Sequence, residues 1–233
     1  MPAELSYPPN HIDKHYIELP RSDFKVRGVA AWASLTLVPL VLYLCYFSWI
    51  GPDAIVLKYA SLVELGIVIL ISWTGLYFWR LDTETPLDEP IRFNRARRKI
   101  YVYRFRHNAL RPFSRAAWGV YPQVYNWDDL RAEFCSIRAV GVRGLVEFLT
   151  IAVIEPTSGR VVDRFIFAHG RQESDMYWAM AQLYMQKGPG AVPKFEAAPR
   201  DWNNEIHFEN IARRLAPKVK WPAVMDIESR TSL

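Results

Sequence analysis

The chain has 233 residues, of which 29 are Lys or Arg and 24 are Asp or Glu, so its formal net charge is +5. This excess is modest for the length of the chain, and it is unevenly distributed. The two cysteines, Cys45 and Cys135, lie in segments of different character, which argues against a bridge between them and excludes a disulfide framework.

Residues 1–28 form a polar segment interrupted by Pro8, Pro9 and Pro20. This composition predicts an extended cytoplasmic N-terminal arm with a short ordered piece at most. His11 and His15 stand four residues apart, a spacing that could hold a metal on a helix. No cysteine or third histidine lies nearby, so a solvated pair is the favoured interpretation and no metal site is predicted.

Two apolar runs follow, Val29–Ile50 with 22 residues and Tyr59–Trp79 with 21 residues. A stretch of about 20 apolar residues spans the hydrocarbon core of a bilayer. The runs are separated only by Gly51–Lys58, and residues 29–79 are therefore predicted to form a transmembrane helical hairpin. The alternative is a buried helix pair of a soluble protein. The length of the runs, their few charges and the Trp and Tyr residues near their ends argue against it.

The second run contains one ionisable residue, Glu64, near its beginning. An ionisable group within a membrane span is a functional candidate by default, although water or a polar neighbour near the interface offers a purely structural alternative. Lys and Arg flank the hairpin on both sides, whereas the connection between the runs holds only Lys58. The positive-inside rule then places both termini in the cytoplasm, for a protein of a bacterial inner membrane.

Residues 80–90 are rich in Asp, Glu and Pro and are predicted to be a linker. Beyond it, apolar and polar residues alternate with period two, which predicts a β-hairpin of 91–93 and 99–106 around a polar turn. Further strands are predicted at 118–124 and 128–137. A second hairpin joins 144–154 to 161–168 through the turn residues Glu-Pro-Thr-Ser-Gly.

A helix is predicted next, ending at Gly188-Pro189, a pair typical of helix C-termini. Its apolar stripe is formed by Met176, Ala179, Met180, Leu183 and Tyr184. A sheet of about six strands followed by one helix is the element order of a pleckstrin-homology-like domain. The predicted fold class is thus a membrane α-hairpin of two transmembrane helices joined to an α+β cytoplasmic domain at 91–190, a pleckstrin-homology-like sheet with a packing helix. Residues 191–233, with a helical piece near 205–215, form a tail that wraps this domain or binds a partner.

A block of basic residues begins where the β-rich domain begins, with nine Lys or Arg and no Asp or Glu from Arg92 to Arg115. Next to a membrane such a block suits anionic headgroups, at about 1 kcal/mol per basic residue near the surface. It also suits an acidic protein, and the alternative is a solvated strand face that only follows the positive-inside rule. The candidate partner- or lipid-binding residues, named the basic block below, are Arg92, Arg95, Arg97, Arg98, Lys99, Arg104 and Arg106.

Sequence motifs of catalytic sites are missing, including G-x-S-x-G, the P-loop, G-x-G-x-x-G and H-E-x-x-H. Asp128 and Asp129 are neighbouring carboxylates, for which an acidic turn is the favoured interpretation. Tyr101, Tyr103 and Phe105 would share one face of a strand, which is more typical of a core than of a platform for single-stranded nucleic acid. We therefore expect a protein that is not an enzyme, with no catalytic residues, cofactors or metal and no nucleic-acid partner.

Four segments together resemble an uncharacterised bacterial family of two-pass inner-membrane proteins with a β-rich cytoplasmic domain. They are IRFNRARRKIYVYR (91–104), VYNWDDLRAEF (124–134), PTSGRVVDRF (156–165) and WAMAQLYMQKGPGAVP (178–193). Members of that family are often encoded beside type VI secretion effectors. The resemblance covers roughly residues 29–193, and it implies a role as an immunity or accessory protein for a secreted toxin.

Two functional hypotheses follow. In the first, the chain is a membrane-anchored, non-enzymatic protein that binds a cognate secreted effector or another protein. In the second, it is a membrane scaffold or a sensor of anionic lipid, unrelated to a toxin, and the basic block contacts membrane lipids. Self-association into a homo-oligomer is left open by the sequence.

Overall fold

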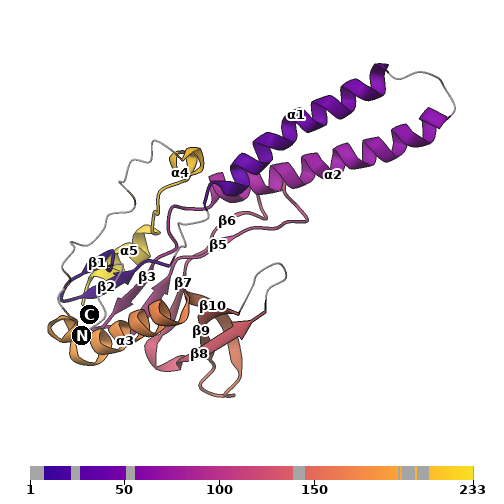
Figure 1. The fold of residues 1–233 in the computed structure, drawn as a ribbon. Helices are drawn as coiled ribbons and strands as arrows, with labels where there is room; N and C mark the ends of the chain where they lie inside the picture. Colours follow the sequence, from indigo (N-terminus) through magenta and orange to yellow (C-terminus); the bar gives the residue numbers. More distant parts are fainter. Residues whose placement is uncertain are drawn as a thin grey trace.

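The computed structural model describes residues 8–21, 27–50, 56–138, 145–193, 195, 203 and 210–232. A long helical hairpin projects from a β-rich body that also carries shorter helices (Figure 1). The expected layout, two apolar helices followed by a β-rich region with helices, is confirmed at this level.

The hairpin consists of α1 (Val29–Ile50) and α2 (Val56–Glu84), which are both long and apolar enough to cross a membrane. Their apolar side chains point outward, with exposed fractions of 64% for Leu42 and 66% for Leu70. Apolar surface of this extent argues against a buried helix pair of a soluble domain. The predicted connection between the helices lies partly outside the described residues.

The second helix is longer than the predicted apolar run at both ends. At its C-terminal end, Arg80 and Glu84 form an ion pair across one turn, with 2.7 Å between Nε and Oε1. Such i,i+4 pairs support an additional turn of helix. The predicted linker at 80–90 is therefore wrong for its first five residues, which are helical.

The larger sheet contains five antiparallel strands in the order β1-β2-β3-β4-β7. These strands are β1 (His11–Ile12), β2 (Tyr16–Leu19), β3 (Ile91–Asn94), β4 (Lys99–Val102) and β7 (Gln123–Asn126). The predicted hairpin between β3 and β4 is present. Its turn includes Arg98, which adopts a left-handed backbone conformation with φ of 50°.

The N-terminal arm, predicted to be extended with a short ordered piece at most, contains the strands β1 and β2 of the larger sheet. Strand β2 pairs along its whole length with β3, from Tyr16 opposite Asn94 to Leu19 opposite Ile91. Ile17 and Leu19 are buried in the core. The short alternating segment was hidden among prolines and polar residues, and its partner strand lies more than seventy residues away.

The smaller sheet has the order β10-β9-β8 and is also antiparallel. It contains β8 (Leu130–Ile137), β9 (Val146–Ile154) and β10 (Val161–His169), and residues 139–144 lie outside the described part. A two-stranded ribbon, β5 (Phe105–Arg106) with β6 (Gly119–Val120), lies beside α2. The predicted strands 99–106 and 118–124 are each divided, into β4 and β5 and into β6 and β7.

Helix α3 (Arg171–Lys187) packs against both sheets and closes the core. Its buried face contains Tyr177, Met180 and Tyr184, whereas Ala179 of the predicted stripe is exposed. The buried face is therefore rotated from the predicted stripe: it keeps Met180 and Tyr184 and also contains Tyr177, Ala181 and Met185. The helix ends as predicted at Gly188, which has φ of 90° and donates its N–H to Tyr184 O at 2.9 Å. A 3-10 turn, η2 (Pro189–Ala191), follows.

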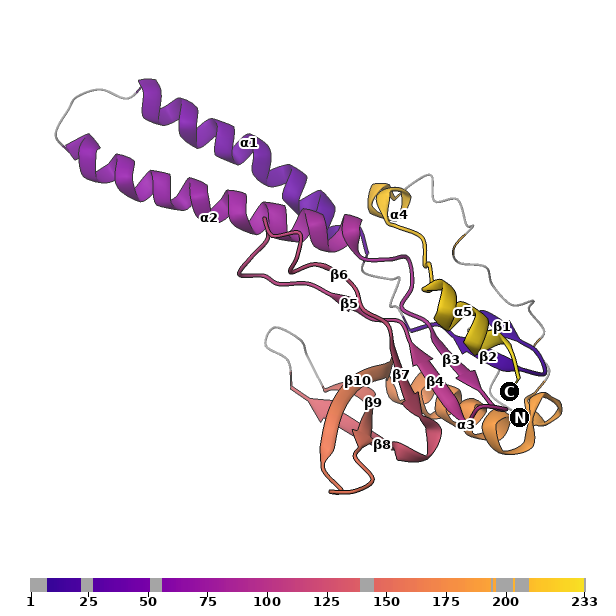
Figure 2. The ribbon, with the colours of Figure 1, turned by 180° about the vertical axis from the view of Figure 1, so that it is seen from behind.

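The C-terminal region belongs to the same body. Helix α4 (Ile211–Leu215) contacts α2, and α5 (Ala223–Arg230) covers the face of the larger sheet that is opposite to α3 (Figure 2). Part of the predicted helical piece, 205–209, lies outside the described residues. Because α5 covers the polar face, both faces of β3 and β4 are buried, whereas the sequence predicted one buried face.

Candidate functional site

Three members of the basic block lie beneath α5. Arg92 is the most buried of them and forms ion pairs with Glu18 of β2 and Asp226 of α5, the second at 2.6 Å. Its guanidinium lies 4.6 Å from the ring centre of Trp221. Burial disfavours its charge, but the two carboxylates outweigh that effect and raise the pKa of Arg92. Arg92 therefore attaches the C-terminal helix to the sheet and is not available to a partner.

Arg97 and Lys99 act in the same way. The Lys99 ammonium contacts a carboxylate oxygen of Glu228 at 2.8 Å, and Arg97 donates to the carbonyl of Thr231 at 3.2 Å. Arg98, on the turn, pairs with Asp128. Among these neighbouring members only Arg95 and Arg98 are fully exposed. Carboxylates of the same chain thus pair with Arg92, Arg98 and Lys99, and the role of the basic block in binding a partner or lipid stays a prediction.

The last two members lie on the other side of the sheet, towards the hairpin. Arg104 contacts Asp163 at 2.5 Å and stacks over Tyr121, with 5.2 Å to the ring centre. Arg106 is exposed and donates to the carbonyl of Ala116 at 3.1 Å. Only Arg104 of the basic block lines the main cavity.

The remaining candidates from the sequence lie apart from one another. Glu64 lies about two turns into α2, partly exposed, and is not among the residues that line the cavity. His11 contacts Asp13 at 3.0 Å, and Asn126 donates to Asp129 at 3.0 Å. Within the described part of the chain, no group of three His, Cys, Asp or Glu residues is arranged to hold a metal.

Reciprocal helix capping joins the two helices to each other at the base of the hairpin. Asp82, near the end of α2, accepts hydrogen bonds from the N–H groups of Gly28 and Ala31 at 3.1 and 2.7 Å. Arg27, directly before α1, donates to the carbonyls of Pro86 at 2.5 Å and Asp82 at 3.1 Å. A carboxylate thus lies at the positive end of one helix dipole and a guanidinium at the negative end of the other. Burial lowers the pKa of Arg27 to about 10.

A second clamp ties the segment after α2 to the body. Asp88 accepts the N–H of Arg21 at 3.1 Å and the amide of Asn10 at 2.9 Å. Arg21 pairs with Glu89 at 2.7 Å and donates to the carbonyl of Tyr103 at 2.7 Å. Burial raises the pKa of Glu89 and lowers that of Arg21. The first clamp thus joins α1 to α2, and the second joins the segment after α2 to the β-rich body.

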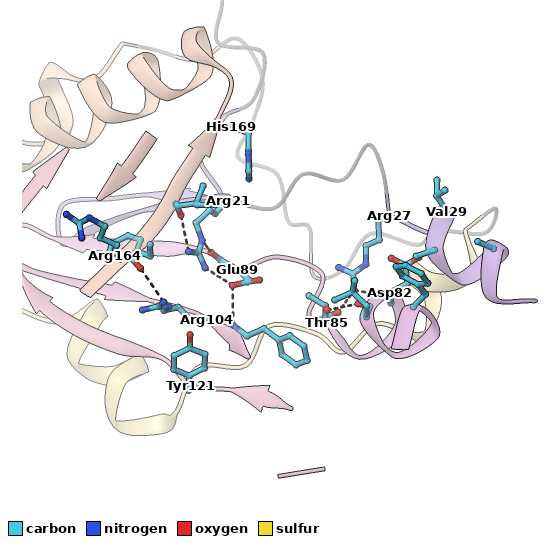
Figure 3. A pocket seen from close by; sticks show the side chains of 17 residues that line it. Arg21, Arg27, Val29, Asp82, Thr85, Glu89, Arg104, Tyr121, Arg164 and His169 are labelled. Carbon is cyan, nitrogen blue, oxygen red and sulfur yellow. Dashed lines mark hydrogen bonds and ion pairs between the residues drawn. The ribbon is translucent and has the colours of Figure 1, made fainter. Parts of the chain in front are cut away.

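Between these clamps lies a cavity of about 870 Å³ (Figure 3). One wall belongs to the first turns of α1 and the last turns of α2 and is apolar, with Val29, Ala33 and Phe78. The other wall belongs to the body and carries Arg104, Tyr121 and residues of β10. Four arginines and two acidic residues line the whole cavity: Arg21, Arg27, Arg104, Arg164, Asp82 and Glu89. Such a site can bind a group that is apolar on one side and anionic or hydrogen-bonding on the other.

The sequence did not single out most residues of this joint. Asp82, Asp88 and Glu89 were assigned to a linker because they lie among prolines, and Arg21 and Arg27 were counted only as flanking charges. One signal was present in the sequence. Acidic residues at the C-terminal end of an apolar helix interact unfavourably with its dipole, which suggests that another segment of the chain pairs with them.

Comparison with known proteins gives one match. A model of a family of unknown function, DUF6708, matches residues 68–233, which extends from the second half of α2 through the β-rich body to the C-terminus. Neither the search of curated proteins nor the search of solved structures finds a match.

Proposed function

This chain belongs to the DUF6708 family of unknown function, and we propose that it is a membrane-anchored binding protein without enzymatic activity. The observation that carries this proposal is the doubly clamped joint between two apolar helices and a β-rich body. Reciprocal capping joins α1 to α2, and Arg21, through Glu89 and the carbonyl of Tyr103, ties the segment after α2 to the body. Such an attachment suits a protein that presents a recognition domain at a membrane surface.

The architecture of the body supports a pleckstrin-homology-like domain. Four strands of the larger sheet, β2, β3, β4 and β7, are followed by the three strands of the smaller sheet and then by α3. Two antiparallel sheets closed by a C-terminal helix are the layout expected for that fold. The hairpin would then be an insertion between its first two strands, and such domains serve mainly as binding modules.

The chain is proposed to lie in a bacterial inner membrane with both termini in the cytoplasm. The supporting observation is the charge asymmetry around the two apolar helices. The proposed partner is a cognate secreted effector, which would make the chain an immunity or accessory protein for a type VI secretion toxin. This partner follows from the resemblance of residues 29–193 to proteins encoded beside such effectors. The cavity at the joint, with its basic and apolar walls, is the proposed contact site.

Co-purification of the full-length protein in detergent with the product of the neighbouring gene tests this proposal. A bulky substitution at the cavity, Ala33→Trp, should abolish co-purification because it fills the space without breaking an ion pair. Thr36→Trp is the matched control, since it places the same side chain one turn further along α1 at an exposed position outside the cavity lining. Equal capture by both variants would refute the cavity as the contact site. Full survival of cells that lack the gene under attack by sibling cells would refute the immunity role.

The second candidate is a scaffold or sensor of anionic lipid, unrelated to a toxin. The basic block as predicted offers it little support, because Arg92, Arg97, Arg98 and Lys99 are paired with carboxylates. Its support comes instead from exposed basic and apolar residues beside α2, which are described next. Self-association of the chain also stays a proposal, to be tested by the mass of the purified protein–detergent complex.

A further inference from the structure

The β5–β6 loop, residues 107–118, extends from the body along the surface of α2 (Figures 1 and 2). The indole of Trp73 donates to the carbonyl of Ala109 at 3.1 Å, and its ring meets Phe113 edge-on at 5.3 Å between ring centres. Closer to the body, Arg80 donates to the carbonyl of Pro112 and lies 4.5 Å from the ring centre of Trp118. The loop is therefore held against the part of α2 that spans residues 73–80.

This position places the loop at membrane depth if α2 crosses a bilayer. Arg80 is the first charged residue after the apolar run of α2, and Trp73 precedes it by seven residues. At a rise of 1.5 Å per residue, Trp73 lies about 10 Å deeper than Arg80 along the helix axis. Phe113 and the carbonyl of Ala109 contact Trp73, whereas the carbonyl of Pro112 contacts Arg80, so the loop lies between these two depths.

Two apolar side chains of the loop are largely exposed. Leu110 has an exposed fraction of 82% and Phe113 of 67%, although both lie beside a helix that is itself apolar. Three arginines, Arg106, Arg111 and Arg115, are also exposed, and the loop contains no Asp or Glu. Apolar tips among basic residues are the pattern of segments that lie in the interface of an anionic membrane.

The backbone of the loop is suited to such an environment. Non-helical backbone is tolerated within a bilayer only where its polar groups are satisfied by the protein. The Leu110 N–H donates to Oδ1 of Asn108 at 2.9 Å, and the Ser114 N–H donates to the carbonyl of Arg111 at 3.2 Å. The indole N–H of Trp118 donates to the same carbonyl of Arg111, at 3.2 Å. Together with the hydrogen bonds from Trp73 and Arg80 of α2, these contacts satisfy backbone polar groups that would otherwise need water as a partner.

We propose that the β5–β6 loop inserts Leu110 and Phe113 into the leaflet that faces the β-rich body, while Arg111 and Arg115 contact the phosphates of anionic lipids. The loop would be a third membrane contact beside the two helices, and it would fix the orientation of the body on the membrane surface. This inference rests on the membrane-anchored part of the proposed function and not on the identity of a protein partner.

The test uses full-length protein in vesicles of phosphatidylcholine with phosphatidylglycerol. In a background of Cys45→Ser and Cys135→Ser, single cysteines are introduced by Leu110→Cys, Leu42→Cys and Ser158→Cys and labelled with the polarity-sensitive fluorophore NBD. Leu42 lies on α1 and reports the hairpin, and Ser158 lies in the exposed turn between β9 and β10. The label at 110 should show blue-shifted emission, protection from iodide and strong quenching by lipids with a nitroxide near the headgroup. The label at 158 should behave as in water.

The outcomes are distinguishable. Lipid quenching at 42 with water-like emission at 110 would overturn the loop proposal and leave the membrane anchor intact. Water-like emission at both positions would refute the anchor itself, and with it the proposed function. Protection from iodide without lipid quenching at 110 would mean that protein covers the loop, which also overturns the proposal. The preference for anionic lipid would be overturned if the label at 110 inserted equally deeply in vesicles of pure phosphatidylcholine. It would also be overturned if the double variant R111Q/R115Q showed the same insertion of this label as the native arginines.

Discussion

Replacement of Arg92 by Ala should release the C-terminal helix from the sheet. The side chain is 5% exposed and lies between the carboxylates of Glu18 and Asp226, which are 14% and 31% exposed. Removal of one partner from a buried ion pair typically costs about 3–5 kcal/mol, because the remaining charge is left buried. The lower end of this range applies here, since water can reach Asp226 once Arg92 is gone.

This loss of free energy can be measured as a faster rate of hydrogen exchange. A loss of about 3 kcal/mol in the free energy that holds α5 closed raises its open population roughly a hundredfold, because each 1.4 kcal/mol is a factor of ten. Hydrogen exchange followed by mass spectrometry on the full-length protein in detergent should therefore show much faster exchange in residues 223–230. Strands β8 to β10 should keep their protection because they do not contact this pair.

Two further variants make the reasoning refutable. Arg98→Ala removes an arginine from an ion pair whose side chains are 52% and 63% exposed, and it should leave exchange in α5 unchanged. Arg92→Lys keeps the charge but lacks the planar fork that reaches both carboxylates, so it should give an intermediate rate. If Arg92→Ala exchanges like the native protein in residues 223–230, Arg92 does not hold the C-terminal helix, and its burial has another cause.

Three further predictions concern the joint and the C-terminal helix. Asp82→Ala removes the cap of α1 and should lower the free energy of unfolding, measured by thermal denaturation in detergent, by about 0.5–2 kcal/mol. Asp82→Asn keeps a hydrogen-bond acceptor, so its free energy of unfolding should fall less. Gly28→Ala should lower the free energy of unfolding by about 1–3 kcal/mol in the same assay, because Gly28 has φ of 99° and a Cβ would lie 2.6 Å from the side-chain amide nitrogen of Asn210. An unchanged melting temperature would contradict this geometry. The hydrogen bond from Lys99 lowers the pKa of Glu228 below its ordinary value of 4.5. The contribution of Glu228 to stability is therefore present above pH 4.5 and is lost as the pH falls through the lowered pKa. Proteolysis of the C-terminal helix should increase on acidification, and it should increase less in Glu228→Gln.

The secondary structure of the β-rich region was largely predictable because its signals are local. Alternation with period two gave the strands on both sides of the Asn94–Arg98 turn, and the Glu155–Gly159 turn gave the β9–β10 hairpin. The strands at 11–19 were missed because β2 finds its partner only across the inserted hairpin. Short strands of this kind are decided by pairing and burial rather than by their own composition.

For the candidate site, too, local patterns were predictable from the sequence, whereas contacts between distant segments were not. A run of arginines in sequence gave a block of candidate binding residues, but alternate residues of a strand point to opposite faces, and their ion-pair partners come from distant segments. Asp226 and Glu228 lie more than 120 residues after the arginines and lysine that they neutralise. Charge counting along a chain cannot show such pairing, because electrostatic contacts depend on distance in space.

The amino-acid sequence by itself determined the two apolar helices, the alternation that makes strands and the helix end at Gly188, because each depends on residues a few positions apart. The tertiary structure alone decided which charges stay free. It placed α5 over Arg92, Arg97 and Lys99, brought Asp82 and Arg27 to opposite ends of two helices, and positioned the β5–β6 loop beside Trp73. These arrangements follow from burial and hydrogen bonding between segments that are far apart in sequence.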